Sequence, residues 1–131
     1  MPITPIITKK LLNTYYVKYN NYLSSSDPIW NLNKVKSKND KEILAFIISC
    51  YCYGNIVQIN KHIGKVLNYT SANIFDFIMH FRKKNIIADI DFKYRFNTNE
   101  DFIELLSALS IILKEYGSLK QLFLKYYDKN D

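Results

Sequence analysis

The side chains that most often carry chemistry are scarce in this chain, which has two Cys and two His among 131 residues. Cys50 and Cys52 lie two positions apart in a predicted helix, so about 200° of rotation separates them and they cannot chelate one ion. His62 and His80 stand at no spacing typical of a metal site. We therefore expect no metal and no cofactor. The cysteines are expected to be buried, reduced thiols of a cytoplasmic protein, and the histidines to lie on helix surfaces or at helix ends.

Acidic residues offer the next possible chemistry. Asp89 and Asp91 could form a pair of carboxylates, but they alternate with apolar residues beside Lys93 and Arg95, which favours a solvated, charge-balanced edge. The three glycines are isolated from one another, so the sequence contains no phosphate-binding loop, and no G-x-S-x-G motif is present. An intact enzyme is therefore the least favoured class, and we expect no catalytic residue in this chain.

The chain is basic, with a net charge of +6 and a pI of about 9.2. An excess of cations suits an acidic partner such as nucleic acid. Arg, which nucleic-acid sites favour for bidentate contacts, accounts for only two of the 18 basic residues. The many Lys, Asn, Ile and Tyr are the residues that an AT-rich genome encodes. We attribute part of the charge to codon bias and keep nucleic-acid binding as a hypothesis.

Apolar residues are dense enough in one segment to raise the question of a membrane span. The uncharged run from Ile43 to Asn60 has 18 residues, near the lower limit for a transmembrane helix. Gly54 and Asn55 interrupt it, so two successive helices are the better interpretation. The first seven residues carry two prolines and no basic residue, which is not the pattern of a signal peptide. We expect no contact with a membrane.

Helical periodicity recurs along most of the chain. The spacing of apolar residues predicts an amphipathic helix over Thr8 to Asn20. Asn39 followed by Glu42 is a capping pattern, so a nearly all-apolar helix is expected to continue to Tyr53 and end at Gly54. Between these helices, Asn21 to Lys38 is predicted to be irregular, with Trp30 packed as a plug against the core.

The rest of the chain follows the same pattern. Asn55 is predicted to cap a helix with a stripe of five apolar residues and the basic pair Lys61 and Lys65 on its flank. Ser71 is predicted to cap a further helix, followed by the cluster Arg82-Lys83-Lys84 at its end. The period-two segment Ile86 to Asn97 is predicted to be an extended connector, because no partner strand is evident. Thr98 or Asn99 is expected to begin a helix to Tyr116, and Ser118 the last helix after Gly117.

These elements predict an all-α fold of about six helices packed round a central apolar helix, Asp40 to Tyr53. Residues 1–131 are expected to form one helical domain.

The chain resembles an uncharacterised bacterial family, domain-of-unknown-function family 2400. The resemblance rests on short motifs in a fixed order: Y-x-x-K-Y-N at Tyr15 to Asn20, S-D-P-I-W at Ser26 to Trp30, N-D-K-E-I-L-A-F-I-I-S-C-Y-C-Y-G-N at Asn39 to Asn55, F-K-Y-R-F-N-T-N-E-D-F-I-E-L-L at Phe92 to Leu106 and E-Y-G-S-L-K-Q-L-F at Glu115 to Phe123. The chain departs from the family pattern at two places: Ile56 stands where an Arg follows Gly-Asn, and Trp30-Asn31-Leu32 stands where Pro-His usually follows D-P-I. The resemblance also implies that this chain is the N-terminal half of a longer family domain.

The family pattern is itself remotely similar to the helix-hairpin-helix DNA glycosylase superfamily. That similarity implies that Gly54 and Asn55 lie at the nucleic-acid face, with Lys61 and Lys65 behind them. Arg95, in the R-F-N motif, completes the set of expected nucleic-acid-binding residues. The catalytic residues of such proteins lie in the later half of the domain.

Two hypotheses follow. The leading one is a helical, glycosylase-like, DNA-associated protein that lacks its catalytic half. The alternative is a helical interaction or structural module, whose exposed apolar face pairs with a second half or with another protein.

Overall fold

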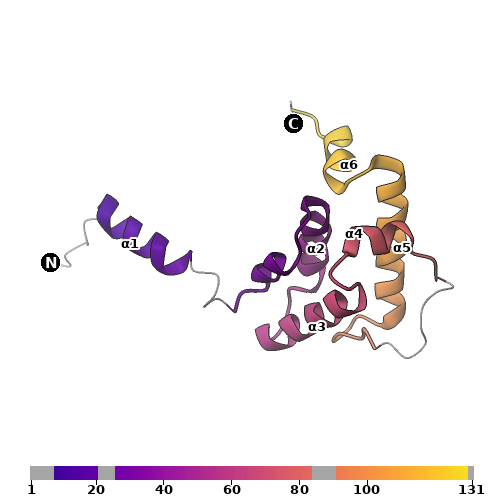
Figure 1. Cartoon of the computed structure of the whole chain (residues 1–131), viewed down its shortest axis with the longest axis horizontal. Helices are drawn as coiled ribbons and strands as arrows, with labels where there is room; N and C mark the ends of the chain where they lie inside the picture. The colour runs from indigo at the N-terminus through magenta and orange to yellow at the C-terminus, as the bar shows by residue number, and fades with distance from the viewer. Residues whose placement is uncertain (1–7, 21–25, 84–90, 130–131) are drawn as a thin grey trace.

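The computed structural model describes residues 8–20, 26–83 and 91–129, and within these ranges it is helical (Figure 1). One 3-10 helix, η2, covers Pro28–Lys34. The six α-helices are α1 (Lys9–Tyr19), α2 (Lys38–Tyr51), α3 (Ile56–Tyr69), α4 (Ile74–Met79), α5 (Asn99–Tyr116) and α6 (Leu119–Tyr126). The described residues contain no named strand, so the predicted all-α fold is confirmed. No helix of the described residues is long and apolar enough to cross a membrane.

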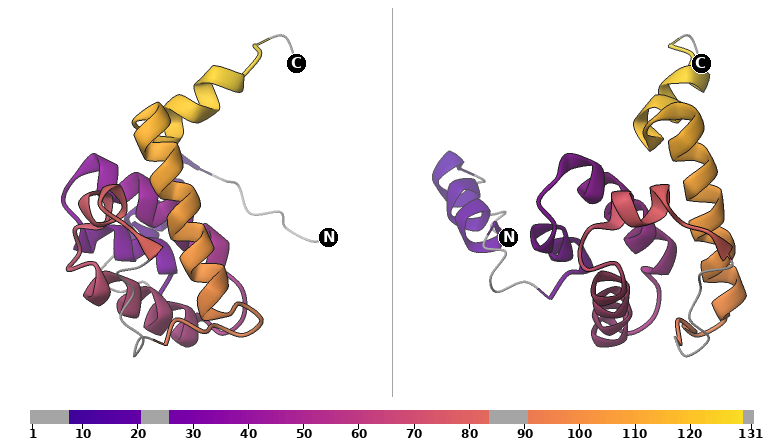
Figure 2. Two further views of the ribbon diagram at one scale, coloured as in Figure 1. Left: turned by 90° about the vertical axis from the view of Figure 1, so that its right-hand side faces the viewer. Right: turned by 45° about the vertical axis from the view of Figure 1, so that its right-hand side comes forward.

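The core lies between α2, α3, α4 and α5. Helix α4 packs on α2 and α5, while η2 contacts α2 and α3. Figure 2 shows α5 running along one side of this body and α6 projecting at its end. The core is a single cluster of apolar side chains to which α2, α3, α4, α5 and α6 all contribute, and Leu32 of η2 packs against it. Its largest fully buried side chains include Tyr51, Phe102, Ile43, Leu44, Ile47 and Ile63.

Helix α2 contributes the most to this core but is not covered on all sides. Five of its apolar residues are buried, whereas Ser49 and Cys50 are exposed and Phe46 is half-buried. This pattern agrees with the prediction of a central apolar helix that is covered on several sides. The open face of α2 around Phe46 becomes one wall of a groove described below.

Several helix starts agree with the capping patterns in the sequence. Asn55 caps α3 and Ser118 caps α6, each through a side chain that accepts a backbone N–H. Thr98 begins α5 with a complete capping box, in which Asp101 accepts from the Thr98 backbone. Gly117 ends α5 in the left-handed region, with φ of 79°. These caps were predictable because donor and acceptor are three residues apart or fewer.

Two capping predictions were wrong. The N-cap of α2 is Ser37, whose hydroxyl accepts from the backbone N–H of Asp40, and Asn39 lies inside the helix. Ser71 has a positive φ and lies in the turn before α4, whose N-cap is Asn73. The Asn73 side chain makes no capping hydrogen bond. Ser37 satisfies the start of α2 locally, whereas the group that satisfies the start of α4 comes from another helix.

Acidic side chains of α2 cap two other helices. The Asp40 Oδ1 atom accepts from the backbone N–H of Phe75, in the first turn of α4, at 2.8 Å. The two carboxylate oxygens of Glu42 accept from the backbone N–H groups of Leu119 and Lys120, each at 3.1 Å. Unpaired N–H groups at a helix start favour a negative charge. Helix α2 therefore fixes the positions of both α4 and α6.

Helix α1 forms as the periodicity predicts, but the described part of the chain buries none of its side chains. Thr8 is its N-cap, and none of its residues is buried. Its apolar side chains, among them Leu12 and Tyr16, remain exposed. Figure 1 shows α1 standing apart from the remaining helices.

The segment predicted to be irregular, Asn21 to Lys38, contains η2 and the first residue of α2. Its residues 21–25 lie outside the described part of the chain. Pro28 begins η2 and holds Asp27 in an extended conformation, as expected before proline. A hydrogen bond joins η2 to α3: the buried side chain of Asn31 donates to the side-chain oxygen of Asn60 at 2.8 Å. Trp30 is half-buried.

The connector before α5 is described only from Asp91 onward. Lys84, Asp89 and the rest of residues 84–90 lie outside the described part of the chain. Phe92 and Tyr94 are buried with Lys93 exposed between them, as period two predicts. The alternation ends at Arg95, whose φ of 52° turns the chain.

Candidate nucleic-acid interface

The Gly54–Asn55 turn joins α2 to α3. Helix α2 ends at Tyr51, two residues earlier than predicted, and Gly54 then adopts a φ of 97°. A residue with a side chain rarely adopts this φ, so glycine suits the position. The Asn55 side chain accepts from the backbone N–H of Val57 at 2.9 Å and starts α3. The turn therefore has the conformation that the sequence predicts.

Arg95 lies directly over this turn. A Cβ atom placed on Gly54 would lie 2.5 Å from an Nη atom of Arg95, so any larger residue would collide with the guanidinium group. The guanidinium carbon also lies 6.0 Å from the ring centroid of Tyr53. Arg95 is exposed. Gly54, Asn55 and Arg95, three of the five expected binding residues, thus gather at one place.

Hydrogen bonds between two tyrosines hold the two segments together. The hydroxyl of Tyr94 donates to the backbone oxygen of Tyr53 at 2.7 Å, and the hydroxyl of Tyr53 donates to the backbone oxygen of Tyr94 at 3.1 Å. The Tyr53 hydroxyl also reaches the side-chain oxygen of Asn97. The backbone of Asn97 pairs in turn with that of Tyr94. This reciprocal pairing positions Arg95 at the turn, and no local sequence pattern predicts it.

The two lysines of α3 have different environments. Lys61 is exposed on the helix surface. Lys65 donates to the backbone oxygen of Asp91 at 3.0 Å, and its ammonium lies 3.9 Å from the Asp91 carboxylate. Part of the charge of Lys65 is therefore neutralised within the fold. Lys61 is the more available cation of the pair.

The electrostatics of the turn favour an anion. Backbone N–H groups at the start of α3 point toward the turn, and a helix N-terminus carries about half a positive charge. Asn55 satisfies one of these groups, that of Val57. Arg95 adds a full charge and a planar donor fork, which is the geometry that matches a phosphate. The arrangement has the geometry and the charge to bind a phosphate group.

His62 is a residue whose environment the sequence analysis missed. It was predicted to lie on a helix surface, and it is 3% exposed. Its ring centroid lies 4.4 Å from that of Tyr51 and 5.0 Å from that of Tyr94, with Phe102 nearby. Burial, and to a smaller extent Lys65, lowers the pKa of His62 from 6.5 to about 4. The imidazole is therefore neutral near pH 7, and its Nε2 atom has no hydrogen-bond partner among the described residues. His80, by contrast, is exposed at the end of α4, as predicted.

The prediction of buried thiols was wrong. Cys50 and Cys52 are both free and both exposed. Cys50 lies on the solvent side of α2, and Cys52 follows the last residue of that helix. Residual burial raises the pKa of the Cys50 thiol, and a hydrogen bond from Ser49 opposes this effect. The environment of the Cys50 thiol therefore does not activate it as a nucleophile. Among the described residues, no group of three His, Cys, Asp or Glu could hold a metal ion.

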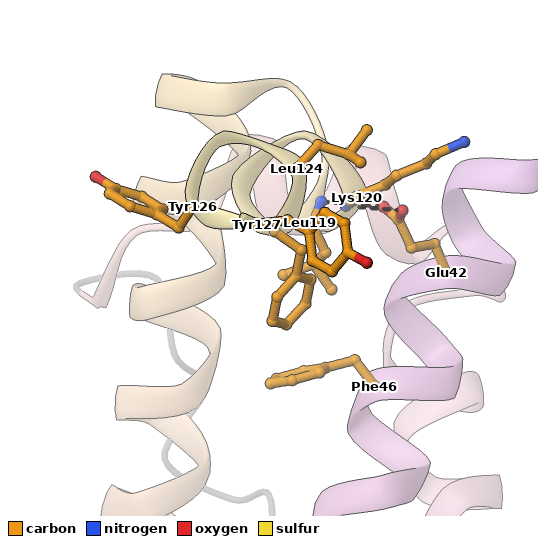
Figure 3. A pocket seen from close by; sticks show the side chains of 8 residues that line it. Glu42, Phe46, Leu119, Lys120, Leu124, Tyr126 and Tyr127 are labelled. Carbon is orange, nitrogen blue, oxygen red and sulfur yellow. Dashed lines mark hydrogen bonds between the residues drawn. The ribbon is translucent and has the colours of Figure 1, made fainter. Parts of the chain in front are cut away.

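A second surface lies between α2 and α6, and we call it the α2–α6 groove (Figure 3). It has a volume of about 730 Å³. Six apolar or aromatic residues and two charged ones line it. These residues are Glu42, Phe46, Leu119, Lys120, Phe123, Leu124, Tyr126 and Tyr127. The groove contains none of the expected nucleic-acid-binding residues.

Comparisons with known proteins give one match. A family model described as "Protein of unknown function (DUF2400)" matches residues 27–131, which is more than half of the chain. No curated protein and no solved structure matches this chain. The matched range contains both the Gly54–Asn55 turn and the α2–α6 groove, and it excludes α1.

Proposed function

The chain belongs to DUF2400, a family of proteins of unknown function, and we propose that it is a DNA-associated helical module that binds the phosphate backbone at the Gly54–Asn55 turn. One observation carries this proposal. The guanidinium group of Arg95 lies against Gly54, beside the start of α3. A helix N-terminus and an arginine at one turn form a site for a phosphate group.

The position of Arg95 also bears on the departure from the family pattern at Ile56. Ile56 cannot contribute a guanidinium group, but Arg95, itself part of the R-F-N motif, still places one at the turn. Lys61, on the exposed face of α3, and the net charge of +6 add a sequence-independent attraction to DNA. The role of the turn would correspond to the one that the remote resemblance to helix-hairpin-helix glycosylases implies. The proposal assigns binding and no reaction to this chain.

The proposal is tested by titrating the protein into a short labelled duplex and measuring fluorescence anisotropy. The titration is repeated at a series of salt concentrations. We expect the affinity to fall as salt rises, because bound phosphates release counterions. The substitution Arg95→Gln should weaken binding about tenfold and lower the salt slope by about one. Gln keeps much of the side-chain stem and removes only the charge and the donor fork.

Lys120→Gln is the matched control, because it removes one charge from α6, outside the turn. It should leave the affinity within about twofold of the unmodified chain. Absence of salt-dependent binding at low ionic strength would refute the proposal. Equal weakening by both substitutions would show that net charge, rather than the turn, determines binding.

A second candidate function is that of a helical interaction module. The observation that favours it is the α2–α6 groove, whose aromatic side chains Phe123, Tyr126 and Tyr127 are exposed. Large apolar patches on a protein surface commonly mark sites of protein contact. The partner in this case would be a second half of the family domain or another protein.

A further inference from the structure

The turn from Tyr94 to Asn97 holds one aromatic side chain out in solvent. Phe96 is 87% exposed, the largest value among the exposed large apolar side chains of the described residues. Its neighbours in the sequence, Arg95 and Asn97, are both polar. A phenyl ring left in water adds nothing to the stability of the fold, because only burial yields that gain. The ring is therefore available to a ligand.

The turn fixes the position of this ring. The backbone N–H of Tyr94 donates to the backbone oxygen of Asn97 at 3.0 Å, and the N–H of Asn97 donates back to Tyr94 at 2.9 Å. The tyrosine pair ties the same turn to Tyr53. Arg95 adopts a φ of 52°, a conformation that costs free energy in a residue with a side chain. A turn that is already ordered loses little conformational entropy when a ligand binds.

Cations lie beside the exposed ring. Lys93 and Arg95 precede it on the same segment, and both are exposed. The carboxylates of this region are offset within the fold. Asp91 accepts from the backbone N–H of Lys93 and faces a lysine of α3, while Glu100 and Asp101 lie at the positive end of α5. Aromatic rings next to cations are the combination with which proteins bind unpaired nucleotides, because bases stack on the rings and phosphates meet the cations.

We infer that Phe96 stacks on an unpaired base of DNA whose backbone lies against the Gly54–Asn55 turn, so that this turn selects DNA with an unpaired nucleotide. The inference rests on the proposed function, because Arg95 has to hold the phosphate that brings the base to the ring. Arg95 and Phe96 are consecutive residues, so one turn contacts both the backbone and the base. A phenyl ring offers no hydrogen bond to a base edge. Selection is therefore by pairing state and not by sequence.

The magnitudes of stacking and unstacking favour an unpaired base over a paired one. One base stacked on one aromatic ring strengthens binding roughly five- to 150-fold, as judged by alanine substitution. Opening a paired and stacked step of a duplex costs a comparable amount, and the cost is least at a mismatched, damaged or unpaired base. A single ring therefore gains little on fully paired DNA and gains most where the base is already free.

Two labelled duplexes of one sequence test the inference on the full chain. In one duplex every base is paired, and in the other an abasic site leaves a single adenine without a partner. Both carry the same number of phosphates, so their sequence-independent attraction is equal. We expect fluorescence anisotropy at fixed salt to show at least about fivefold tighter binding of the duplex with the unpaired adenine.

Substitutions at Phe96 separate stacking from charge. Phe96→Ala should abolish the preference, while the affinity for the paired duplex stays within about twofold and the salt slope is unchanged. Phe96→Trp should keep the preference, and the unpaired duplex should quench its added indole emission more than the paired duplex does. Subtracting the emission of the unmodified chain removes the contribution of Trp30. Phe123→Ala is the matched control, because Phe123 is 63% exposed on α6, and it should keep the preference.

Equal affinity for the two duplexes would overturn the inference, as would a preference that survives Phe96→Ala or that Phe123→Ala removes equally. Salt-dependent binding without any preference would overturn this inference alone and leave the proposed function standing. Absence of salt-dependent binding to either duplex would remove both. Self-association that Phe96→Ala disrupts, measured by sedimentation without DNA, would assign the ring to a second copy of the chain instead.

Discussion

At the scale of single residues, His62 has the strongest influence on how the protein should respond to pH. Its imidazole lies among Tyr51, Tyr94 and Phe102, with Lys65 and Asp91 as the charged groups that act on it. Burial favours the neutral ring and holds its pKa near 4, whereas an unfolded chain binds the proton near pH 6.5. The unfolded state therefore takes up a proton first as the pH falls. Stability is lost between about pH 6.5 and pH 4.

Replacing His62 with Phe should remove this pH dependence. Between about pH 7.5 and pH 5, His62 should cost the unmodified chain roughly 2 kcal/mol of unfolding free energy, and His62→Phe should avoid that loss. Urea unfolding at the two pH values measures the difference. His80→Gln is the control, because it removes the other histidine, which is exposed at the end of α4. A His62→Phe variant that loses as much stability on acidification as the unmodified chain would contradict this account.

Two glycines provide a matched pair of substitutions. Gly54→Ala should destabilise the fold by about 1–3 kcal/mol, because Gly54 has a φ of 97° and Arg95 occupies the space of a side chain. Gly64→Ala, inside α3 with open space around it, should stabilise by up to about 1 kcal/mol. Thermal unfolding of both variants compares the two effects. Similar changes at the two positions would mean that the turn is not constrained as described.

At the scale of secondary-structure elements, α2 organises the fold through its two acidic side chains. Asp40 binds the start of α4 and Glu42 binds the start of α6, from one turn of one helix. Asp40 is buried, and its carboxylate accepts a hydrogen bond from the Phe75 backbone N–H. Loss of this acceptor leaves a partly buried donor without a partner.

Asp40→Ala should therefore cost about 2 kcal/mol of unfolding free energy and speed hydrogen exchange in α4. Asn39→Ala is the control, because Asn39 is exposed within α2 and makes no cap. That change should stay within about 0.5 kcal/mol. Denaturant unfolding gives both values. If Asn39→Ala cost more than Asp40→Ala, Asn39 would be the N-cap after all.

The comparison of these elements indicates what a sequence can reveal. Asn55 and Ser118 were identified as caps, and Thr98 was one of two candidates with Asn99, because each acts within three residues of its own position. Asp40 and Glu42 act across 35 and 77 residues, so no local pattern reveals their partners. The same reason explains the candidate site. The Gly54–Asn55 turn was predictable, while the placement of Arg95 depends on a tyrosine pair 41 residues apart.

Burial was harder to predict than helix formation. The run from Ile43 to Tyr53 is so apolar that its period does not show which side faces the core, and the exposure of Cys50 and Cys52 was missed for that reason. His62 was missed because a histidine on an amphipathic helix fits either face. Its neighbours Tyr94 and Phe102 come from segments whose packing only the fold reveals.

At the scale of the whole molecule, the two candidate surfaces lie at opposite ends of α5. Arg95, which lies over the Gly54–Asn55 turn, comes shortly before the start of α5, whereas the α2–α6 groove is lined by α6, the helix that follows the end of α5. Figure 1 shows α6 at one end of α5. A helix of 18 residues spans about 27 Å, which exceeds the screening length of about 8–10 Å at moderate salt. The two surfaces should therefore bind their ligands independently.

The central claim is that DNA contacts the Gly54–Asn55 turn, and a heteronuclear NMR titration with a short duplex at low salt tests it most directly. We predict progressive shifts of the backbone amides of residues 53–57 and 94–97, with Lys61 also affected and α6 unchanged. Shifts centred on α1 or α6, or no shifts at all, would contradict the claim.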